Sequence, residues 1–130
     1  MAPSNVTFRG HLDTADLVTA LGSARAFLFA AEEDFGIVPV EAQATGTPVI
    51  AFGQGGALET VRGLDTDMPT GVFFAAQEPD AVADAVMRFE DARERFDPAH
   101  IRAHAQSFRP ERFDAAYRAA IDEAVASFPE

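Results

Sequence analysis

Three residue types are missing from this 130-residue sequence: cysteine, tryptophan and lysine. The absence of cysteine excludes disulfide bonds and cysteine-ligated zinc, and it leaves the redox compartment open but compatible with the cytosol. Long apolar runs are also missing, since runs such as Ala26–Ala31 are far shorter than the roughly 20 residues of a membrane-spanning helix. No signal peptide is recognisable either, and we expect a cytoplasmic protein.

Positive charge is scarce in this sequence. Ten arginines stand against 21 acidic residues, which gives a formal net charge of −11. Nucleic acids and anionic membranes are bound by clustered Lys and Arg, because those side chains neutralise phosphate groups. The charge balance therefore argues against nucleic acid and anionic membrane as direct partners of this segment.

Hydrophobic residues make up 48% of the sequence, which suits one globular domain with a moderate core. Short apolar runs alternate with amphipathic stretches, and this alternation predicts an α/β fold in which helices flank a parallel sheet. We expect strands over residues 6–8, 27–29, 49–52 and 72–74. We expect helices over about 14–23, 38–45, 82–89 and 98–106, and from about 110 onward.

The last predicted helix places five apolar residues along one stripe: Phe113, Tyr117, Ile121, Ala124 and Phe128. By default such a stripe packs into the core of its own domain. The alternative is an exposed stripe that favours self-association, which would make the protein a homo-oligomer.

The run from Glu32 to Ala51 (EEDFGIVPVEAQATGTPVIA) joins an acidic loop, a helix start and a buried strand. It follows the predicted strand over residues 27–29, and loops at strand ends are where α/β folds bind ligands. Pro39 suits the first turn of a helix, and Gly46 suits the left-handed position just past its end. The unpaired N–H groups from about Gly36 to Val40 would then form a site for an anion such as a diphosphate.

Two carboxylates, Glu33 and Glu41, stand eight residues apart, one on the acidic loop and one in the first turn of the predicted helix. Both can border one pocket, where carboxylates would accept hydrogen bonds from sugar hydroxyls while the amides hold phosphate. Alternatively, Glu41 is an acid placed favourably near the helix start, which is worth a few tenths to about 1 kcal/mol. The spacing alone favours this second interpretation.

The chain resembles the C-terminal half of the retaining, family-four glycosyltransferases, which have two Rossmann domains (the GT-B architecture). Their signature is Glu-x7-Glu, and Glu33 and Glu41 supply it here. The similarity runs from about Val6 to Ala124. It includes NVTFRGHL at residues 5–12, TPVIA at 47–51, the Gly55-Gly56 pair with Glu59-Thr-Val, and GVFF at 71–74.

The resemblance implies a role for each residue of the motif. Glu33 would contact hydroxyls of the donor sugar near the reacting carbon, and Glu41 would hold the ribose of the nucleotide. Backbone amides would hold the diphosphate, and they belong to Phe35, Gly36, Ile37 and Val38. The family in general needs no metal, and the nucleotide sugar is a substrate, so we expect no cofactor.

Within the family, the sequence EDFGIVPVEAQA, together with TGVFF and FRPERF, is similar to bacterial and archaeal GDP-mannose-dependent mannosyltransferases. The family resemblance thus implies transfer of a sugar from a nucleotide diphosphate carrier to a hydroxyl acceptor, with retention of the anomeric configuration. The narrower resemblance to the mannosyltransferases implies that this sugar is mannose. Two positions depart from the family pattern, Ala30 where proline is frequent and Arg109 where a helix-capping serine is usual. Neither touches the predicted site.

The resemblance also implies parts that residues 1–130 do not contain. A complete enzyme has an N-terminal acceptor domain and two further strand–helix units that carry an Arg and a Lys for the diphosphate. We therefore expect residues 1–130 to form an incomplete nucleotide-sugar-binding domain that is inactive alone. Its partners would be the donor and the missing domain or a second chain. The complete enzyme could lie on the membrane periphery. Alternatively, the chain is a non-catalytic nucleotide-sugar-binding or dimerising fragment.

In the family's sheet order, the two missing strands would lie between residues 6–8 and 27–29. Unpaired backbone groups along such a gap are costly. The chain must therefore close the gap, borrow strands from a partner, or leave its first strand displaced.

Four further features have weaker interpretations. His100 and His104 could chelate zinc, but no third ligand is evident, and we expect a solvated pair. His11 lines the cleft or belongs to a turn. The glycine-rich stretch at residues 53–56 is a turn near the donor, since Leu58 stands where a dinucleotide fingerprint needs glycine. Glu59 caps the next helix or borders this turn.

Overall fold

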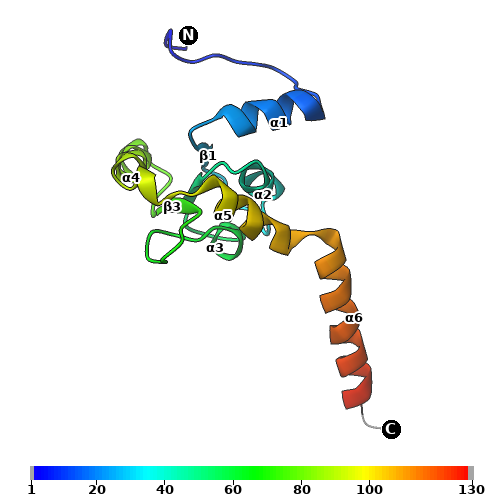
Figure 1. Cartoon of the computed structure of the whole chain (residues 1–130). Helices are drawn as coiled ribbons and strands as arrows, with labels where there is room; N and C mark the ends of the chain where they lie inside the picture. Colours follow the sequence, from blue (N-terminus) through cyan, green and yellow to red (C-terminus); the bar gives the residue numbers. More distant parts are fainter. Residues whose placement is uncertain (1, 129–130) are drawn as a thin grey trace.

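The computed structural model describes residues 2–128 and confirms an α/β fold (Figure 1). Its sheet has three strands in the order β1–β2–β3, all parallel. These strands are β1 (Phe27–Phe29), β2 (Val49–Phe52) and β3 (Gly71–Phe74). β2 lies in the middle and all four of its residues are buried, which explains its continuous apolar sequence.

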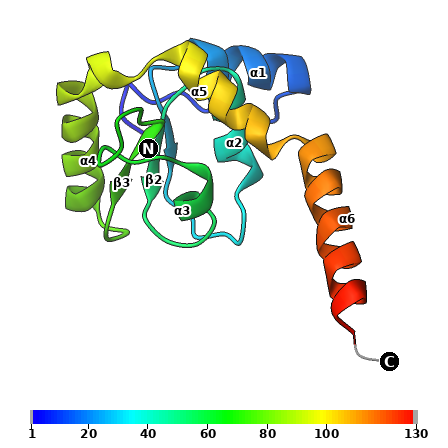
Figure 2. The same ribbon diagram turned by 60° about the horizontal axis from the view of Figure 1, so that its bottom comes forward.

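Residues of β2 alternate between two core clusters, one on each face of the sheet. Val49 and Ala51 pack with Leu21 of α1 (Thr14–Ser23), and Ala42 of the next helix joins the same cluster. Ile50 and Phe52 face the other way and pack with residues of β3 and with Phe89 of α4 (Pro79–Asp91). Figure 2 shows the resulting layers, with α4 on one side of the sheet and α2 and α3 on the other.

The helix bounds follow from capping residues and glycines. Asp13 caps α1, since its side chain accepts a hydrogen bond of 2.8 Å from the N–H of Asp16. Gly46 has a φ of 87° just beyond α2 (Ile37–Ala44), as predicted for the end of a helix. Asp97 caps α5 (Pro98–Ala105) by accepting from two backbone N–H groups. The remaining helices are α3 (Ala57–Thr60), η1 (Arg93–Arg95), η2 (Gln106–Phe108) and α6 (Pro110–Ser127).

The predicted strand over residues 6–8 is wrong. This segment lies outside any helix or strand, and its apolar side chains Val6 and Phe8 are 47% and 85% exposed. A strand needs a neighbour to pair its backbone groups, and β1 forms the edge of the sheet with β2 on its other side. Of the three alternatives for the sheet gap, the structure thus adopts a displaced first segment.

The default expectation for the last helix is also wrong. α6 extends away from the rest of the molecule (Figures 1 and 2), and each of its residues is exposed. Its apolar stripe therefore faces solvent: Phe113 is 66% exposed, and Tyr117 and Ile121 are exposed as well. A stripe of this kind is a surface that other protein can cover. Among the described residues, no helix is long and apolar enough to cross a membrane.

Candidate functional site

Three loops meet at the carboxyl ends of the three strands. The acidic loop, residues 30–35, follows β1; the glycine turn, residues 53–56, follows β2; and residues 75–78 follow β3. Two hydrogen bonds tie the first loop to the others. The N–H of Gly56 donates to the carbonyl of Glu33 at 2.7 Å, and Nε2 of Gln77 donates to the carbonyl of Ala30 at 2.7 Å. The edge of the sheet where α/β folds bind ligands is therefore a connected surface.

The glycine turn packs directly on the backbone of the acidic loop. A Cβ added to Gly55 would lie 2.5 Å from the carbonyl oxygen of Glu33, and one added to Gly56 would lie 2.4 Å from that of Asp34. Gly55 also has a φ of 62°, which disfavours other residues. Both glycines are thus needed for this close approach, which supports the interpretation of the turn as part of the site.

The start of α2 presents free backbone donors. Gly36 is its N-cap with a φ of 78°, a left-handed conformation that favours glycine. The N–H groups of Gly36, Ile37 and Val38 form no hydrogen bond with any described residue. The side chains of Phe35, Ile37 and Val38 are exposed, whereas Gly36 is buried, so the part of this helix end that is open to solvent is at residues 37 and 38. An anion placed here would meet unpaired N–H groups and the positive end of the helix dipole.

The two glutamates have different neighbours in the structure. Glu33 lies on the acidic loop with its backbone fixed by Gly56 and its side chain exposed. Glu41 lines an apolar groove of about 310 Å³ between α1 and α2, together with Leu17 and Leu21. Its predicted place in the first turn is wrong: α2 begins at Ile37, which puts Glu41 in the second turn. A benefit from the helix dipole falls off beyond the first turn, so this explanation of Glu41 loses force.

A buried polar cluster lies behind the site and joins α2, α3 and α5. Gln43 is fully buried, and its Nε2 donates to the carbonyl oxygens of Pro39 at 3.2 Å and Thr60 at 3.0 Å. Nε2 of His104 lies 3.0 Å from the same Thr60 oxygen. Thr60 in turn donates both its N–H and its hydroxyl to Gly56. The cluster therefore holds α2 in a fixed position relative to the glycine turn.

Burial lowers the pKa of His104, because desolvation disfavours the charged imidazolium. Arg62 and His100 act in the same direction, and the hydrogen bond to Thr60 acts against it. The neutral ring with a proton on Nε2 satisfies the Thr60 oxygen. The expected solvated histidine pair is thus wrong, since His104 is half-buried and Nε2 of His100 is shielded from solvent without a hydrogen-bond partner among the described residues.

Aromatic contacts connect the acidic loop to the start of α6. Phe35 packs edge-on against Phe108 with ring centroids 5.9 Å apart, and Phe108 packs edge-on against His104 at 5.4 Å. Phe35 and Phe108 also line a cavity of about 310 Å³ together with Arg109 and Arg112. The expectation that position 109 does not touch the site is therefore wrong, since Arg109 shares this cavity with Phe35. No group of three metal-ligating side chains occurs within residues 2–128.

Sequence reasoning missed the roles of Gln43 and Gln77. Gln43 gave one signal, a polar residue on the face of α2 that also buries Pro39 and Ala42. Two other predicted residues have no established role, although Glu59 lies in α3 directly after the glycine turn. His11 is exposed in the segment before α1 with no strand ahead of it, and the exposed side chain of Glu59 forms no capping bond among the described residues.

Comparison with known proteins supplies the family. A family profile described as "Glycosyl transferases group 1" matches residues 1–105. The chain belongs to this family. Its parallel sheet with flanking helices corresponds to the C-terminal part of such enzymes.

Three curated relatives illustrate the range of the group 1 glycosyltransferases. The chain is 47% identical over 78 residues to the D-inositol 3-phosphate glycosyltransferase of Streptomyces griseus, covering 58% of this chain and 16% of the relative. It is 43% identical over 63 residues to the lipopolysaccharide core biosynthesis mannosyltransferase LpsB of Rhizobium meliloti (48% and 17%). It is 45% identical over 65 residues to a GDP-mannose-dependent monoacylated alpha-(1-6)-phosphatidylinositol monomannoside mannosyltransferase of Corynebacterium glutamicum (44% and 17%).

A solved structure extends the similarity beyond the family profile. Sucrose-phosphate synthase from Thermosynechococcus elongatus superposes with a TM-score of 0.70 at 29% sequence identity, covering 94% of this chain and 31% of that one. The group 1 chain described here thus spans less than a third of that enzyme and 16–17% of the three curated relatives.

Proposed function

We propose that residues 1–130 form the donor half-site of a retaining hexosyltransferase that transfers a sugar from a nucleoside diphosphate to a hydroxyl acceptor. The observation that supports this most directly is the packing of Gly55 and Gly56 on the acidic loop. This packing holds Glu33 at the carboxyl edge of the sheet beside the open start of α2. A carboxylate beside unpaired amides suits a ligand that has both hydroxyls and phosphates.

In this function the start of α2 binds the diphosphate. The free N–H groups of Gly36, Ile37 and Val38 would donate to its oxygens, with the amide of Phe35 beside them. Negative charge grows on the diphosphate as the bond to the sugar breaks. Preorganised donors of this kind stabilise such a charge without reorganising during the reaction. Leaving-group stabilisation is thus the contribution of the α2 start.

Glu33 and Glu41 would divide the remaining contacts. Glu33, on a loop whose backbone is fixed by Gly56, would orient the sugar and help stabilise the positive charge that develops at its reacting carbon. Glu41, one turn into α2, would accept hydrogen bonds from the two ribose hydroxyls. The site of the hydroxyl acceptor would lie on another domain of the complete enzyme, and the partner of this chain is that domain.

GDP-mannose is the donor that we propose. Two relatives are mannosyltransferases by name, and one of these is named as GDP-mannose-dependent, while three others are named D-inositol 3-phosphate glycosyltransferases. The D-inositol 3-phosphate glycosyltransferase of Streptomyces griseus is more identical to the chain and carries no mannosyl name. The proposal of a mannosyl donor is therefore separate from the proposal of a nucleotide-sugar site, and it needs its own test.

Calorimetric titration of the 130-residue chain with GDP, GDP-mannose and UDP tests both. We expect a GDP species to bind and Glu41→Ala to weaken binding about tenfold, the loss that follows removal of a charged hydrogen-bond acceptor. Glu123→Ala is the matched control, since it removes an exposed glutamate from α6, which extends away from the rest of the molecule. Tighter binding of UDP than of GDP would contradict the mannosyl donor. Equal binding by wild type and Glu41→Ala would contradict the ribose role.

In the complete enzyme the two glutamates should separate kinetically. Glu33→Ala should lower kcat more than it weakens nucleotide affinity, whereas Glu41→Ala should mainly weaken affinity. Equal losses of affinity in both variants would contradict this division. Circular dichroism of each variant would show that the fold is intact.

A further inference from the structure

A second cavity lies at the opposite end of the sheet from the candidate donor site. Its volume is about 230 Å³, and it is lined by residues that precede β1, by residues that precede β2 and by the end of α4 with the segment that follows. Ala24 and Arg25 lead into β1, and Thr47 and Pro48 lead into β2. The cavity is therefore at the amino ends of the parallel strands, and none of its lining residues belongs to the acidic loop or the glycine turn.

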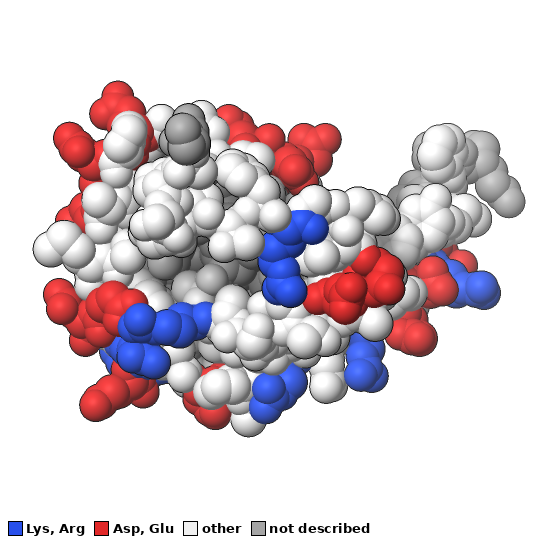
Figure 3. Space-filling view, turned by 90° about the horizontal axis from the view of Figure 1, so that it is seen from above, with Lys and Arg blue, Asp and Glu red and all other residues white. Residues whose placement is uncertain are grey.

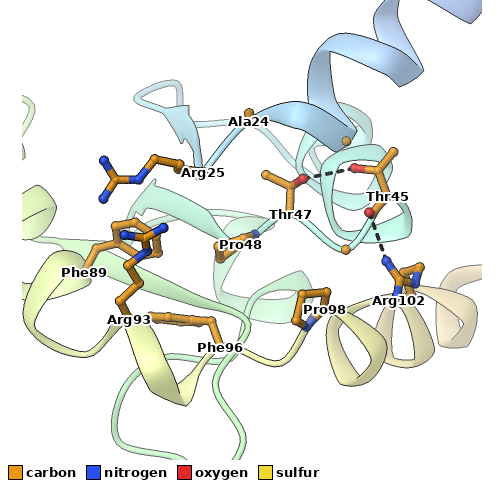
Figure 4. Close-up of a pocket in the computed structure, with 12 residues that line it drawn as sticks. Ala24, Arg25, Thr45, Thr47, Pro48, Phe89, Arg93, Phe96, Pro98 and Arg102 are labelled. Atoms are coloured by element: carbon orange, nitrogen blue, oxygen red, sulfur yellow. Dashed lines mark hydrogen bonds between the residues drawn. The ribbon is translucent and has the colours of Figure 1, made fainter.

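Three of the ten arginines line this cavity: Arg25, Arg93 and Arg102. None of the lining residues is acidic, although the chain has 21 acidic residues. Figure 4 shows that Arg25 and Arg93 extend toward the same end of the cavity from opposite sides, while Arg102 lies at the other end. In Figure 3, basic side chains border a hollow on one face of the molecule. The cavity lining itself is thus basic, while acidic residues flank it: Arg25 pairs with Glu90, and Arg93 also borders a neighbouring hollow with Glu90, Asp91 and Glu94.

Most of the donor capacity of these arginines is unused. Arg25 pairs with Glu90 through one nitrogen, and Nη1 of Arg102 donates to the carbonyl of Thr45 at 3.3 Å. Arg93 forms no hydrogen bond or ion pair with any described residue, although acidic residues stand at positions 90, 91 and 94. A guanidinium group has five N–H donors, so a single accepting group leaves several of them free. The cavity therefore offers free, directional cationic donors at the end where Arg25 and Arg93 meet.

The floor of the cavity is apolar and consists of aromatic rings and prolines. Phe89 is buried at 3% exposure and packs against Phe96 with ring centroids 5.2 Å apart. Pro48 and Pro98 continue this surface toward Arg102. Ligand sites in proteins commonly combine such a surface with a few convergent polar groups that orient the ligand.

We propose that this cavity binds a small phosphate monoester, with its phosphate between Arg25 and Arg93 and its body over the Phe89–Phe96 floor. Guanidinium groups match phosphate geometry through paired N–H donors, and two of them here approach from opposite sides. The cavity volume suits a ligand the size of a sugar phosphate rather than a macromolecule. Because the lining residues are separate from those of the donor half-site, this binding does not depend on the proposed transferase function.

Calorimetry of the 130-residue chain with glucose 6-phosphate as the probe tests this proposal. Arg93→Gln should weaken binding about tenfold, as expected for loss of a charge-assisted contact. Because Arg93 has no partner among the described residues, this change should leave the thermal midpoint by circular dichroism unaltered. Arg118→Gln is the matched control, since it removes one exposed arginine from α6, and it should bind like wild type. Glu41→Ala should also bind like wild type, which separates this cavity from the donor half-site.

Several results would overturn the proposal. One is equal affinity of wild type and Arg93→Gln, and another is an equal loss in Arg93→Gln and Arg118→Gln, which would indicate attraction of anions to any exposed arginine. Binding of glucose as strong as that of glucose 6-phosphate would exclude a phosphate site. Inorganic phosphate supplies the last comparison. We expect it to bind more weakly than the ester, and equal binding would overturn the role given to the aromatic floor.

Discussion

Replacement of Gly56 by alanine should disrupt the contact between the glycine turn and the acidic loop. A Cβ at this position would lie 2.4 Å from both the carbonyl oxygen of Asp34 and the Cα of Phe35. Both are backbone atoms, so neither can move aside as the end of a side chain can. The φ of Gly56 is −63°, which alanine adopts without strain. The effect of the substitution would therefore report the contact and not the backbone conformation.

The expected loss of stability is the balance of three effects. Forcing a methyl group into a packed site costs about 1–3 kcal/mol. Displacement of the loop also weakens the 2.7 Å hydrogen bond from Gly56 to Glu33, at a cost of about 0.5–1.5 kcal/mol. Alanine also restricts the conformations of the unfolded chain, which stabilises the folded state by about 0.4–1 kcal/mol. The free energy of unfolding should thus fall by about 0.5–4 kcal/mol, and GDP binding should weaken because the loop that holds Glu33 has moved.

Urea denaturation of Gly56→Ala beside Gly53→Ala measures this effect. Gly53 belongs to the same turn, but a Cβ there would meet its nearest atoms at 3.4 Å, an ordinary contact, and its φ is not left-handed. Gly53→Ala should therefore stay within about 0.5 kcal/mol of wild type. The reasoning is refuted if both variants unfold at the same urea concentration and both keep the nucleotide affinity of the wild type.

Three further predictions concern the scaffold. Phe89→Ala should lower the free energy of unfolding by about 3–5 kcal/mol, because it empties a fully packed position of the core; a loss below 1 kcal/mol in urea would contradict this. Asp97→Ala should cost about 0.5–2 kcal/mol through the lost cap of α5, with Asp97→Asn retaining most of it. Since burial lowers the pKa of His104, the folded state binds fewer protons than the unfolded state, and stability should fall as the pH drops below about 6.5. Urea midpoints from pH 5 to 8 should show this slope in wild type and a smaller one in His104→Gln.

Local chemistry explains which elements could be predicted from the sequence. β2 has the predicted bounds, because a buried central strand has a continuous apolar sequence between two breaks. Gly46 acts as predicted because the ends of helices depend on adjacent residues. The segment over residues 6–8 has the apolar sequence of a strand as well, but a strand also needs a pairing neighbour, and the sequence of the segment does not reveal whether one is present.

The candidate site was predictable in part for the same reason. The Glu-x7-Glu spacing and Gly36 are close in sequence, so the acidic loop and the start of α2 could be located. The contact of Gly56 with the loop joins residues more than 20 positions apart, and the cluster of Gln43, Thr60 and His104 joins three helices. The cavity with Arg25, Arg93 and Arg102 combines residues from positions 22 to 102. No spacing rule links such distant positions, and only the fold brings them together.

The hydrogen bond from the N–H of Gly56 to the carbonyl of Glu33 holds the acidic loop through its backbone, without using the side chain of Glu33. The position of the loop is fixed by this backbone hydrogen bond, and the carboxylate of Glu33 forms no hydrogen bond with the described residues. Position 33 can therefore accept aspartate, glutamine or alanine without a change in the path of the chain around it. Such a series would vary the length and charge of one side chain while the backbone around it stays the same, and it would show directly whether this acid influences the choice of sugar.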